Sequence, residues 1–465
     1  MSDPASGLPP PEAVVERALA AAGGGGCLVV VEESHQAEVR FANNTTTTNG
    51  VRVDRRVMVV RTVEVGGGVA AGVARRAGDA DVAEMVVAAA ADAAASSPAG
   101  DAAPLVEGDA EPGFAGAAPR ADLGALAGVL SSLSGAFARA EKSGRVLSGF
   151  AEQAVGTTWL GSSTGLRRRH VQPAGTVQLV GRSAGGTRSA WAAEAAADLT
   201  GTGVGPLEER VARGLEHAAR RIDVPAGRHE VVLPPEAVAD LMVFLVASAG
   251  GQEAAEGRTV FSRAGGGTRV GEVLSALPLE LWSDPAQPGL EGAPFVTAGA
   301  SGPDVSVFDN GMAVGRTSWI GGGRLGHLAY HRAGAARAGA EPAPPPGNLL
   351  LELPGATGTV DDLVARTEHG LLLTCLWYIR EVDPATLLLT GLTRDGVYVV
   401  EDGAVVGAAN NFRFNESPVD LLSRATEAGG TVRALGRELG EWMSRTAMPA
   451  LRVPDFNMSS VSTAS

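Results

Sequence analysis

One apolar stretch near the middle of the chain, Arg228–Arg258, constrains the fold more than any other. Its sequence, RHEVVLPPEAVADLMVFLVASAGGQEAAEGR, predicts a short strand at Glu230–Leu233, followed at once by a helix that ends at Gly250-Gly251. The two prolines between strand and helix suit a first helical turn, where the missing N–H costs nothing. Apolar side chains recur along the helix at three- and four-residue spacing: Val238, Leu241, Met242, Leu245 and Val246. A helix this apolar belongs in the core of its domain, and it carries neither histidine nor cysteine.

The length and charge of the chain limit its architecture and its partners. With 465 residues the chain can form two or three domains around a sizeable core. Lys and Arg number 38 against 52 Asp and Glu, and the net charge of -14 argues against a nucleic-acid partner, because phosphate binding needs clustered cations. The basic cluster Arg167–His170 is too short for a footprint on a duplex, and we interpret it as a solvated strand face or turn.

The cysteines and the N-terminus indicate a cytoplasmic protein. Cys27 and Cys375 lie far apart in apolar surroundings, which indicates buried free thiols rather than a disulfide framework. The first residues lack the basic and apolar regions of a signal peptide, and no run of about 18 uncharged apolar residues is present to span a membrane. We therefore expect a cytoplasmic location and no membrane partner.

Shifts in composition divide the chain into segments. Residues 96–117 (SSPAGDAAPLVEGDAEPGFAGA) are rich in Pro, Gly and acidic residues, which is typical of a linker. The fold class that the patterns predict is α+β. Its expected parts are an N-terminal α/β domain at residues 1–100, a linker at 101–120, a central α+β domain at 121–226 and a β-rich C-terminal domain at 227–465. Mixed or antiparallel sheets are expected in the first two domains.

Local patterns in the first segment predict a series of strands. Cys27–Glu32 has the pattern of a buried strand, and Glu38–Ala42 follows as a second strand. Val51–Val65 is a long run rich in β-branched residues, which favours a strand. Asn43-Asn44 opens a polar, Thr-rich turn before it that ends in Asn49-Gly50, and this last dipeptide between two strand-like runs predicts a hairpin.

The C-terminal segment predicts further elements. Gly370–Tyr378 is strongly apolar and is predicted to be one buried strand. A hairpin is predicted at Asp304–Arg316, with its turn at Asn310-Gly311. Val432–Met443 is predicted to be a helix, and the tail MPALRVPDFNMSSVSTAS is too apolar in its first half to be loose, so we expect it to dock on the third domain.

The histidines of this chain do not complete a known zinc motif. A zinc hydrolase needs two histidines one helical turn apart, with a carboxylate beside them as general base. His229-Glu230 begins such a motif, but the partner positions hold residues that cannot bind a metal, and we interpret the pair as a strand end. His327 and His331 have i, i+4 spacing. We interpret them as surface or packing histidines, and a metal site is the alternative.

Candidate nucleophiles and phosphate-binding loops are equally weak. The GSSTG sequence at Gly161–Gly165 resembles a nucleophile elbow but lacks the helix that should follow its serine. Cys375 has no nearby cation to lower the pKa of its thiol. The glycine-rich runs show neither the ending of a P-loop nor the GxGxxG order of a dinucleotide fold. Side-chain chemistry alone therefore reveals no active site.

An ordered set of segments nevertheless resembles a known family. The segments are EVRFANN, GSSTG, LPPEAVADLMVFLVASAGGQEAAEGR, GNLLLELPGATGTVDDLVARTEHGLLLT, VYVVEDGAVVGAANNFRFNESPVDLL and the PDFNMSS tail. Together they cover nearly the full length in order, and the chain resembles the TldD/PmbA family of prokaryotic proteins, which is peptidase U62-like. The GLLLTCLWYIREVDP and NNFRFNESPVDLL blocks are similar to the form found in actinobacteria.

The resemblance implies two related subunits with different roles. The TldD type has HExxxH on the first helix of the third domain and a later cysteine as zinc ligands, and it cleaves small or unfolded peptides. The TldE (PmbA) type lacks these ligands and is required as a partner. The matching helix here, Pro235–Gly250, has no histidine, and Arg445–Pro454 has no cysteine. The resemblance therefore implies a non-catalytic TldE-like subunit with no catalytic residue, metal ligand or cofactor of its own. Zinc is expected in a TldD-like partner subunit, with a peptide as substrate.

One polar and aromatic run offers candidate contacts with that peptide or partner. Asn411, Phe412, Arg413, Phe414 and Asn415 are predicted to lie at a strand-to-helix connection and to line the substrate channel or the subunit interface. The alternative is a conventional loop in which the two phenylalanines pack inward.

Two other functions compete with that of a partner subunit. One is a self-sufficient metal-dependent hydrolase that uses His327 and His331. The other is a stand-alone peptide-binding or scaffold protein, working as a homodimer.

Overall fold

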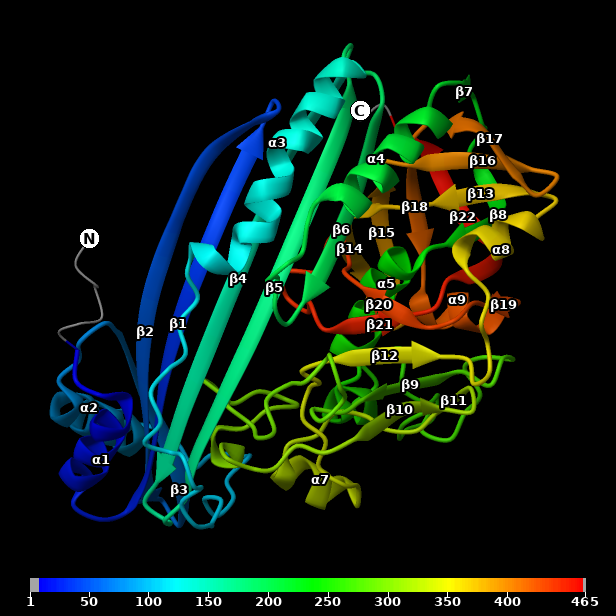
Figure 1. The fold of residues 1–465 in the computed structure, drawn as a ribbon. Helices are drawn as coiled ribbons and strands as arrows, with labels where there is room; N and C mark the ends of the chain where they lie inside the picture. The colour runs from blue at the N-terminus through cyan, green and yellow to red at the C-terminus, as the bar shows by residue number, and fades with distance from the viewer. Residues whose placement is uncertain (1–7, 463–465) are drawn as a thin grey trace.

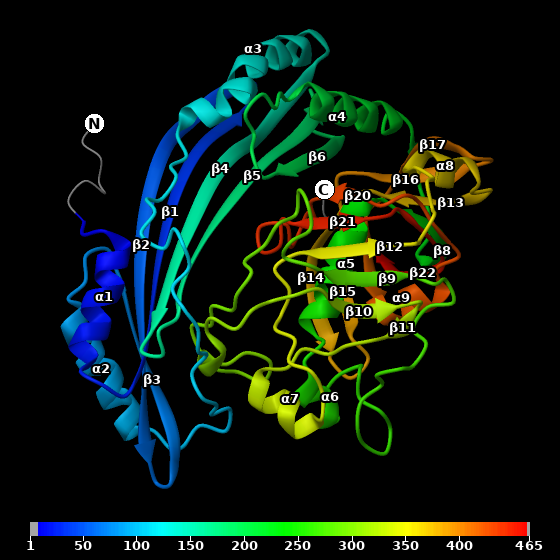
Figure 2. The same ribbon diagram turned by 60° about the horizontal axis from the view of Figure 1, so that its bottom comes forward.

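The computed structural model describes residues 8–462 and has an α+β fold built on three sheets (Figure 1). One long sheet from the N-terminal half curves around a C-terminal part that contains the other two sheets (Figure 2). This confirms the predicted fold class.

The first sheet has six antiparallel strands in the order β3-β2-β1-β4-β5-β6. They are β1 (Gly26–Ala42), β2 (Thr45–Val65), β3 (Gly68–Ala77), β4 (Arg145–Ser162), β5 (Arg167–Ser183) and β6 (Ser189–Ala196). β1 pairs with β4 from Leu28 to Phe41. Segments 1–100 and 121–226 therefore contribute strands to one continuous sheet, and residues 101–120 connect two halves of that sheet.

β1 is a single strand where the sequence predicts two. Its polar middle remains in the ladder because Glu33 is buried and accepts a hydrogen bond from Arg55 Nε of β2 at 2.8 Å. Buried charges are stable when they are paired, so this strand needs no break at its charged residues.

The turn between β1 and β2 is at Asn43-Asn44, where the predicted turn opens, but its predicted extension to Asn49-Gly50 is wrong. Both turn residues have positive φ, 53° and 58°, which a two-residue hairpin turn requires to match the twist of its strands. Asn44 also accepts a hydrogen bond from Leu147 N at 2.7 Å and donates one to Arg145 O at 2.9 Å. Asn49 instead pairs with Val39 inside the ladder.

Helices cover the convex face of this sheet at its two ends (Figure 2). Those at one end are α1 (Pro11–Ala22) and α2 (Val82–Ala95), and those at the other are η1 (Leu123–Leu126), α3 (Ala127–Lys142) and α4 (Gly205–His217). Alternate residues of a strand point to opposite faces. Val29 and Val31 of β1 therefore pack under α1 and α2, and Val39 and Phe41 pack under α3 and α4.

The helical stretch Leu123–Lys142 is long and apolar enough, by length and composition alone, to cross a membrane. Its buried residues include Val129, Leu133 and Ala136, which belong to the apolar cluster under the first sheet. The helix thus covers the sheet with one face, as an amphipathic core helix does.

The basic cluster Arg167–His170 lies on β5, as predicted for a strand face, but it is half-buried and its arginines hold neighbouring chain in place. Arg167 bonds Glu16 of α1 at 2.9 Å, and Arg168 donates to Asp109 O at 3.0 Å. The Arg169 guanidinium lies 5.6 Å from the centre of the Trp159 ring. These arginines fix both α1 and residues 109–117 against the end of the sheet, because each guanidinium can bond several acceptors at once.

The C-terminal part contains the other two sheets. The ten-stranded sheet consists of β7 (Arg221–Ile222), β8 (Gly227–Leu233), β13 (His369–Leu373), β14 (Leu376–Asp383), β15 (Leu388–Thr393), β16 (Val397–Glu401), β17 (Ala404–Ala409), β18 (Phe412–Glu416), β19 (Glu427–Ala428) and β22 (Leu451–Val461). The six-stranded sheet consists of β9 (Glu280–Ser283), β10 (Thr317–Gly321), β11 (Arg324–Leu325), β12 (Leu349–Glu352), β20 (Val432–Ala434) and β21 (Thr446–Met448). β22 pairs with both β8 and β18, which confirms that the tail docks on this part.

Helix α5 (Pro235–Ala247) lies in the core between these two sheets. Its apolar residues share one cluster with Leu281 and Trp319 of the six-stranded sheet and with Leu373 and Phe414 of the ten-stranded sheet. This confirms the prediction of a short strand followed by a core helix. The remaining helices are α6 (Gly251–Ala255), η2 (Val307–Asp309), α7 (Arg332–Ala338), α8 (Val360–Ala365) and α9 (Pro418–Arg424).

Two predicted strand elements of the C-terminal part are wrong. Gly370–Tyr378 is split between β13 and β14, because Thr374 leaves the ladder and its hydroxyl bonds Gly396 O at 2.9 Å. The hairpin expected at Asp304–Arg316 does not form. The buried Asn310 side chain donates to Ala298 O and Val307 O, each at 3.0 Å, which turns the chain back onto residues 296–298.

The helix predicted at Val432–Met443 is also absent. Only β20 is regular in this region, and residues 435–443 form a series of turns. The helix is prevented by Asp240 of α5, whose carboxylate binds backbone N–H groups of these turns.

Candidate functional site

A fully buried carboxylate joins α5 to residues 436–439. Asp240 is 0% exposed and accepts hydrogen bonds from the backbone N–H groups of Arg437 (2.9 Å), Glu438 (3.1 Å) and Leu439 (2.8 Å). A helix would turn these N–H groups toward its own carbonyls, so the carboxylate selects a turn instead. A Cβ on Gly436 would lie 2.4 Å from Asp240 Oδ1, which is why only glycine fits there. Burial raises the pKa of Asp240 to about 7, against the opposing effect of the three N–H donors.

The turns at residues 436–442 and the adjoining strand β14 each display an exposed aromatic side chain. Glu438 accepts hydrogen bonds from Tyr378 N and Arg380 Nη1, each at 3.0 Å. Tyr378 has a φ of 53° and is 57% exposed, and the Arg380 guanidinium lies 4.4 Å from the centre of its ring. Trp442 is 61% exposed. A tyrosine at positive φ is strained, and such strain is concentrated at functional positions.

The side chains of α5 do not fit a zinc ion. Within α5 the residues from Ala237 to Val246 are buried and apolar apart from Asp240 and the partly buried Phe244. Its two carboxylates are already used, since Glu236 bonds Arg210 and Asp240 bonds the backbone. Zinc needs deprotonated nitrogen, sulfur or carboxylate donors that are free to converge on it.

The alternative metal pair is placed on a helix start. His331 is 3% exposed, and its Nδ1 accepts a hydrogen bond from Gly334 N at 3.1 Å as the N-cap of α7. His327 lies four residues earlier, after β11. In the part of the chain that the structure describes, no three His, Cys, Asp or Glu side chains are grouped to hold a metal ion.

Of the predicted contact residues, Phe412 to Asn415 lie in strand β18, which leads into α9, and Asn411 directly precedes that strand. Phe412 and Phe414 are both 0% exposed in β18 and pack in the core around α5, which matches the inward-packing alternative. Arg413 lies on the opposite face of β18, is exposed, and bonds Thr390 at 3.3 Å. Only that opposite face can contact a peptide or a partner.

The candidate nucleophiles have structural contacts. Ser163 Oγ accepts a hydrogen bond from Cys27 N at 3.0 Å, which fixes the tight turn at Gly161–Gly165 against β1. Burial raises the pKa of the Cys27 thiol to about 11 and also raises that of Cys375. Neither cysteine has the lowered pKa that a reactive thiolate requires.

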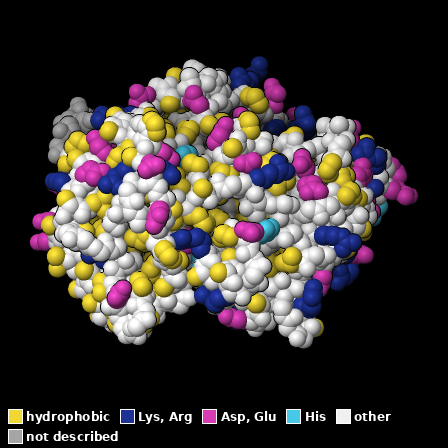
Figure 3. Space-filling view, turned by 90° about the horizontal axis from the view of Figure 1, so that it is seen from below, with side chains coloured by type: hydrophobic (Ala, Val, Ile, Leu, Met, Phe, Trp, Pro, Cys, Tyr) yellow, Lys and Arg dark blue, Asp and Glu magenta, His cyan; other side chains and the backbone are white. Residues whose placement is uncertain are grey.

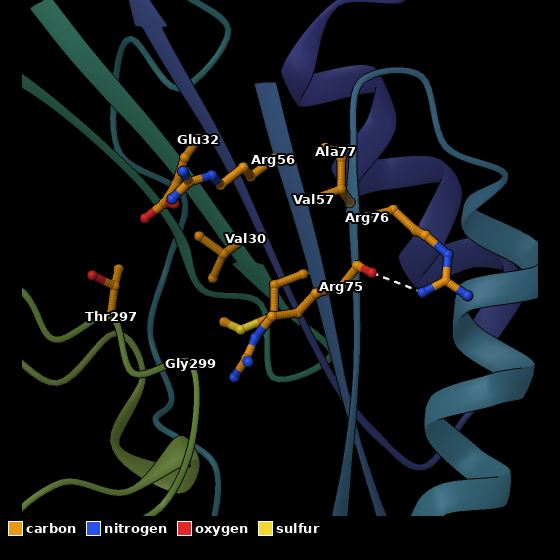
Figure 4. A pocket seen from close by; sticks show the side chains of 10 residues that line it. Val30, Glu32, Arg56, Val57, Arg75, Arg76, Ala77, Thr297 and Gly299 are labelled. Atoms are coloured by element: carbon orange, nitrogen blue, oxygen red, sulfur yellow. Dashed lines mark hydrogen bonds between the residues drawn. The ribbon is translucent and has the colours of Figure 1, made fainter. Parts of the chain in front are cut away.

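A groove that the sequence does not predict lies on the concave face of the first sheet. One cavity of about 460 Å³ is lined by Val30, Glu32, Arg56, Met58 and Arg75 of the sheet, with Thr297 and Gly299 of the C-terminal part opposite them (Figure 4). A second cavity of about 370 Å³ continues it and shares Glu32 and Arg56. Their lining residues span β1 from Val30 to Gln36, which is roughly 20 Å of strand.

Contacts on either side of the groove fix its width. At one end Phe295 and Phe308 pack against Leu28 and Val30 of the sheet. At the other end Arg437 is stacked between two rings, with its Cζ 5.3 Å from the centre of Trp191 on β6 and 4.6 Å from that of Trp377 on β14. The groove therefore lies between the first sheet and the C-terminal part, which these contacts hold at a fixed separation.

Charged side chains of both signs are interspersed over the face seen in Figure 3. No large patch of one sign is visible on that face.

A comparison with models of protein families shows which family the chain belongs to. The family model described as "PmbA/TldA metallopeptidase C-terminal domain" matches residues 226–460, just over half of the chain. The chain belongs to the PmbA/TldD family. The matched region contains α5, Asp240 and the turns that Asp240 holds.

Solved structures of the family have the same fold over nearly the whole chain. TldE from Thermococcus kodakarensis matches with a TM-score of 0.76 at 17% identity and covers 96% of this chain and 99% of its own. A putative modulator of a DNA gyrase from Thermotoga maritima MSB8 matches with a TM-score of 0.74 at 15% identity, covering 96% and 99%. A putative modulator of DNA gyrase from Bacteroides thetaiotaomicron VPI-5482 gives 0.71 at 13% identity, covering 97% and 99%. The search of the curated proteins found no match.

Proposed function

We propose that this PmbA/TldD-family chain is a non-catalytic, TldE-type subunit of a two-subunit zinc metallopeptidase in the cytoplasm. Its partner is a TldD-like subunit that carries the zinc, and the pair cleaves small or unfolded peptides, either to degrade them or to process a precursor. The observation that carries this proposal is the chemistry of α5. The helix that would bear HExxxH in a TldD-type subunit is apolar here, and its buried carboxylate binds backbone N–H groups.

The Asp240 contact gives α5 a different role from metal binding. It connects α5 to residues 436–439 through hydrogen bonds, and those residues in turn hold Tyr378 and Arg380 through Glu438. Exposed Tyr, Trp and Arg side chains are typical of protein interfaces. The region around α5 is thus suited to present a surface to a partner rather than to perform hydrolysis.

Reconstitution with a family member that carries HExxxH tests this proposal. Each protein is purified alone and then mixed, and both complex formation and cleavage of an unfolded peptide are measured. We expect cleavage only by the mixture, and a 1:1 complex by analytical ultracentrifugation.

Matched variants make the outcome specific. A His→Ala change in the HExxxH motif of the relative should abolish cleavage while leaving the complex intact. Cleavage by this chain alone, and its loss in His331→Ala, would support a self-sufficient hydrolase and contradict the proposal. A homodimer that binds the peptide but forms no complex with the relative would point to a scaffold protein.

A further inference from the structure

We propose that the groove on the concave face of the first sheet binds the carboxylate of an extended peptide through Arg56 and Arg75. The groove is an existing cavity of about 460 Å³ with a continuation of about 370 Å³. Its length of roughly 20 Å fits about six residues of extended chain. The choice of a peptide as ligand rests on the proposed function, whereas the binding of a carboxylate rests on the groove itself.

Two guanidinium groups are available in the groove. Arg56 of β2 and Arg75 of β3 lie on neighbouring strands, offset by two residues, because Arg56 pairs with Ala77 and Met58 pairs with Arg75. Both side chains are exposed, and within residues 8–462 neither guanidinium has a hydrogen-bond or ion-pair partner. Two other arginines of this sheet, Arg55 and Arg167, instead form ion pairs with Glu33 and Glu16.

The cavity combines this positive charge with an apolar floor. Val30 and Met58 form the floor, and Glu32 is the acidic side chain that lines the same cavity. Three arginines, Arg56, Arg75 and Arg76, against one glutamate give this cavity a local excess of positive charge in a chain whose net charge is -14, whereas its continuation is lined by Glu33, Asp54 and Arg52 as well. A carboxylate is the planar anion that guanidinium groups bind best by paired hydrogen bonds.

The opposite wall is rigid and polar. Thr297 contributes a hydroxyl, and Gly299 lies so close to Arg75 that an added Cβ would be 2.9 Å from Arg75 Nη2. Residues 296–298 are held by the buried side chain of Asn310 and by the Val296 N to Met312 O bond at 2.9 Å. A ligand between the sheet and this wall would meet Arg75 directly.

A control arginine lies elsewhere on the same sheet. Arg76, the residue after Arg75 on β3, is directed away from Thr297 and Gly299 in Figure 4, and its Nη1 bonds Arg75 O at 2.8 Å, but it is also one of the residues that line the cavity. Arg182 of β5 is exposed and lines neither cavity. A change at Arg182 removes the same charge from the same sheet without touching the groove.

Fluorescence anisotropy on this chain alone tests the proposal. The probe is a fluorescein-labelled peptide of about six residues with alternating Ser and Val and a free C-terminal carboxylate. The comparison is the same peptide with a C-terminal carboxamide. We expect the free acid to bind about tenfold more tightly, from one charge-assisted contact. Arg75→Gln and Arg56→Gln should remove that difference and Arg182→Gln should preserve it, with unchanged melting temperatures in all three.

Other outcomes would overturn the proposal. Equal affinity for the acid and the amide would show that no carboxylate is recognised, and wild-type binding by Arg75→Gln would remove the site. Displacement of the probe by sodium acetate at the peptide's own concentration would assign the groove to small carboxylates rather than to peptides. Loss of binding here with cleavage intact in the two-subunit mixture would reject this site alone, whereas failure of that mixture would reject the proposed function.

Discussion

Asp240 shows how one side chain can decide the structure of a distant segment. Its carboxylate satisfies three backbone N–H groups that are almost two hundred residues away in sequence. Buried N–H groups without a partner are costly, so these turns and the core helix stabilise each other. The sequence of Val432–Met443 predicts a helix, and the prediction fails because the segment itself contains no information about this distant partner.

Removing the Asp240 carboxylate should destabilise the C-terminal part strongly. Asp240→Ala leaves three N–H groups without their acceptor, and we expect the free energy of unfolding to fall by about 3 kcal/mol in urea titration. Asp223→Ala is the control, because that side chain is 93% exposed and should change the value by less than about 0.5 kcal/mol. Equal effects of the two changes would contradict the role of Asp240.

The same carboxylate should make stability depend on pH. In the folded protein Asp240 keeps its proton up to about pH 7, whereas an unperturbed aspartate loses it near its pKa of 3.8. Between these values the folded state binds more protons than the unfolded state, so the free energy of unfolding falls as pH rises. The contribution is complete below the unfolded pKa, is lost as pH rises through the folded pKa, and amounts to roughly 4 kcal/mol at most.

Asp240→Asn provides the comparison for this titration. Urea unfolding of both proteins from pH 4.5 to pH 8 should show a falling wild-type curve relative to the variant, which cannot titrate at this position. Parallel curves would mean that burial does not govern the ionisation of Asp240.

At the level of whole elements, β18 separates a structural face from a face that can make contacts. Phe412 and Phe414 fill the core, while Arg413 points the other way and is exposed. Side chains alternate between the two faces along a strand, so only the face of Asn411–Asn415 that carries Arg413 is available to contact a peptide or a partner.

Paired substitutions in β18 distinguish its two faces. Phe414→Ala should lower the free energy of unfolding by about 4 kcal/mol, because it leaves a cavity in the main core. Arg413→Ala should change the unfolding free energy by less than about 0.5 kcal/mol and instead weaken complex formation or peptide cleavage with the HExxxH-bearing relative. Normal pairing and cleavage by Arg413→Ala would remove this face from the channel and from the interface.

The elements that the sequence predicts correctly are those whose signal is local. The strand and helix at Glu230–Ala247 follow from prolines and from the spacing of apolar residues. β1 is misread as two strands because its buried charge is paired only across the sheet, between Glu33 and Arg55. The sequence indicates a turn that opens at Asn43-Asn44 but overestimates its length, because the contacts of Asn44 with Arg145 and Leu147 of β4 are not encoded in a local pattern.

The candidate site divides in the same way. The absence of histidine and cysteine from α5 and the family resemblance are both readable in the sequence, and the family membership is confirmed. The groove is not readable, because Val30, Arg56, Arg75 and Gly299 come together only when three strands and a distant loop are in place.

At the scale of the whole molecule, several contacts hold the curved sheet to the C-terminal part. Phe295 and Phe308 form one of them, Arg437 between Trp191 and Trp377 forms another, and Gln172 of β5 donates a hydrogen bond to Glu291 O at 3.1 Å. Arg437 also donates to Gln178 on β5 at 3.3 Å. A planar guanidinium can stack on two rings and bond an amide at once, which an ammonium group cannot do.

Loss of the Arg437 stack should loosen this arrangement. Arg437→Ala is expected to lower the free energy of unfolding by about 2 kcal/mol and to raise the radius of gyration in small-angle scattering, and Arg437→Lys should recover less than half of the loss. Arg221→Ala, at a side chain that is 74% exposed, is the control. A wild-type unfolding curve for Arg437→Ala would show that the other contacts between the two parts are sufficient without this stack.

The central claim is that this chain carries no catalytic zinc, and the zinc content of the purified chain tests it most directly. Elemental analysis is performed on the chain alone, with its mass in solution measured on the same sample. We predict far less than one zinc ion per chain, and the appearance of stoichiometric zinc only when the HExxxH-bearing relative is added. Stoichiometric zinc in this chain alone would contradict the account, and His327 and His331 would then be the first residues to replace.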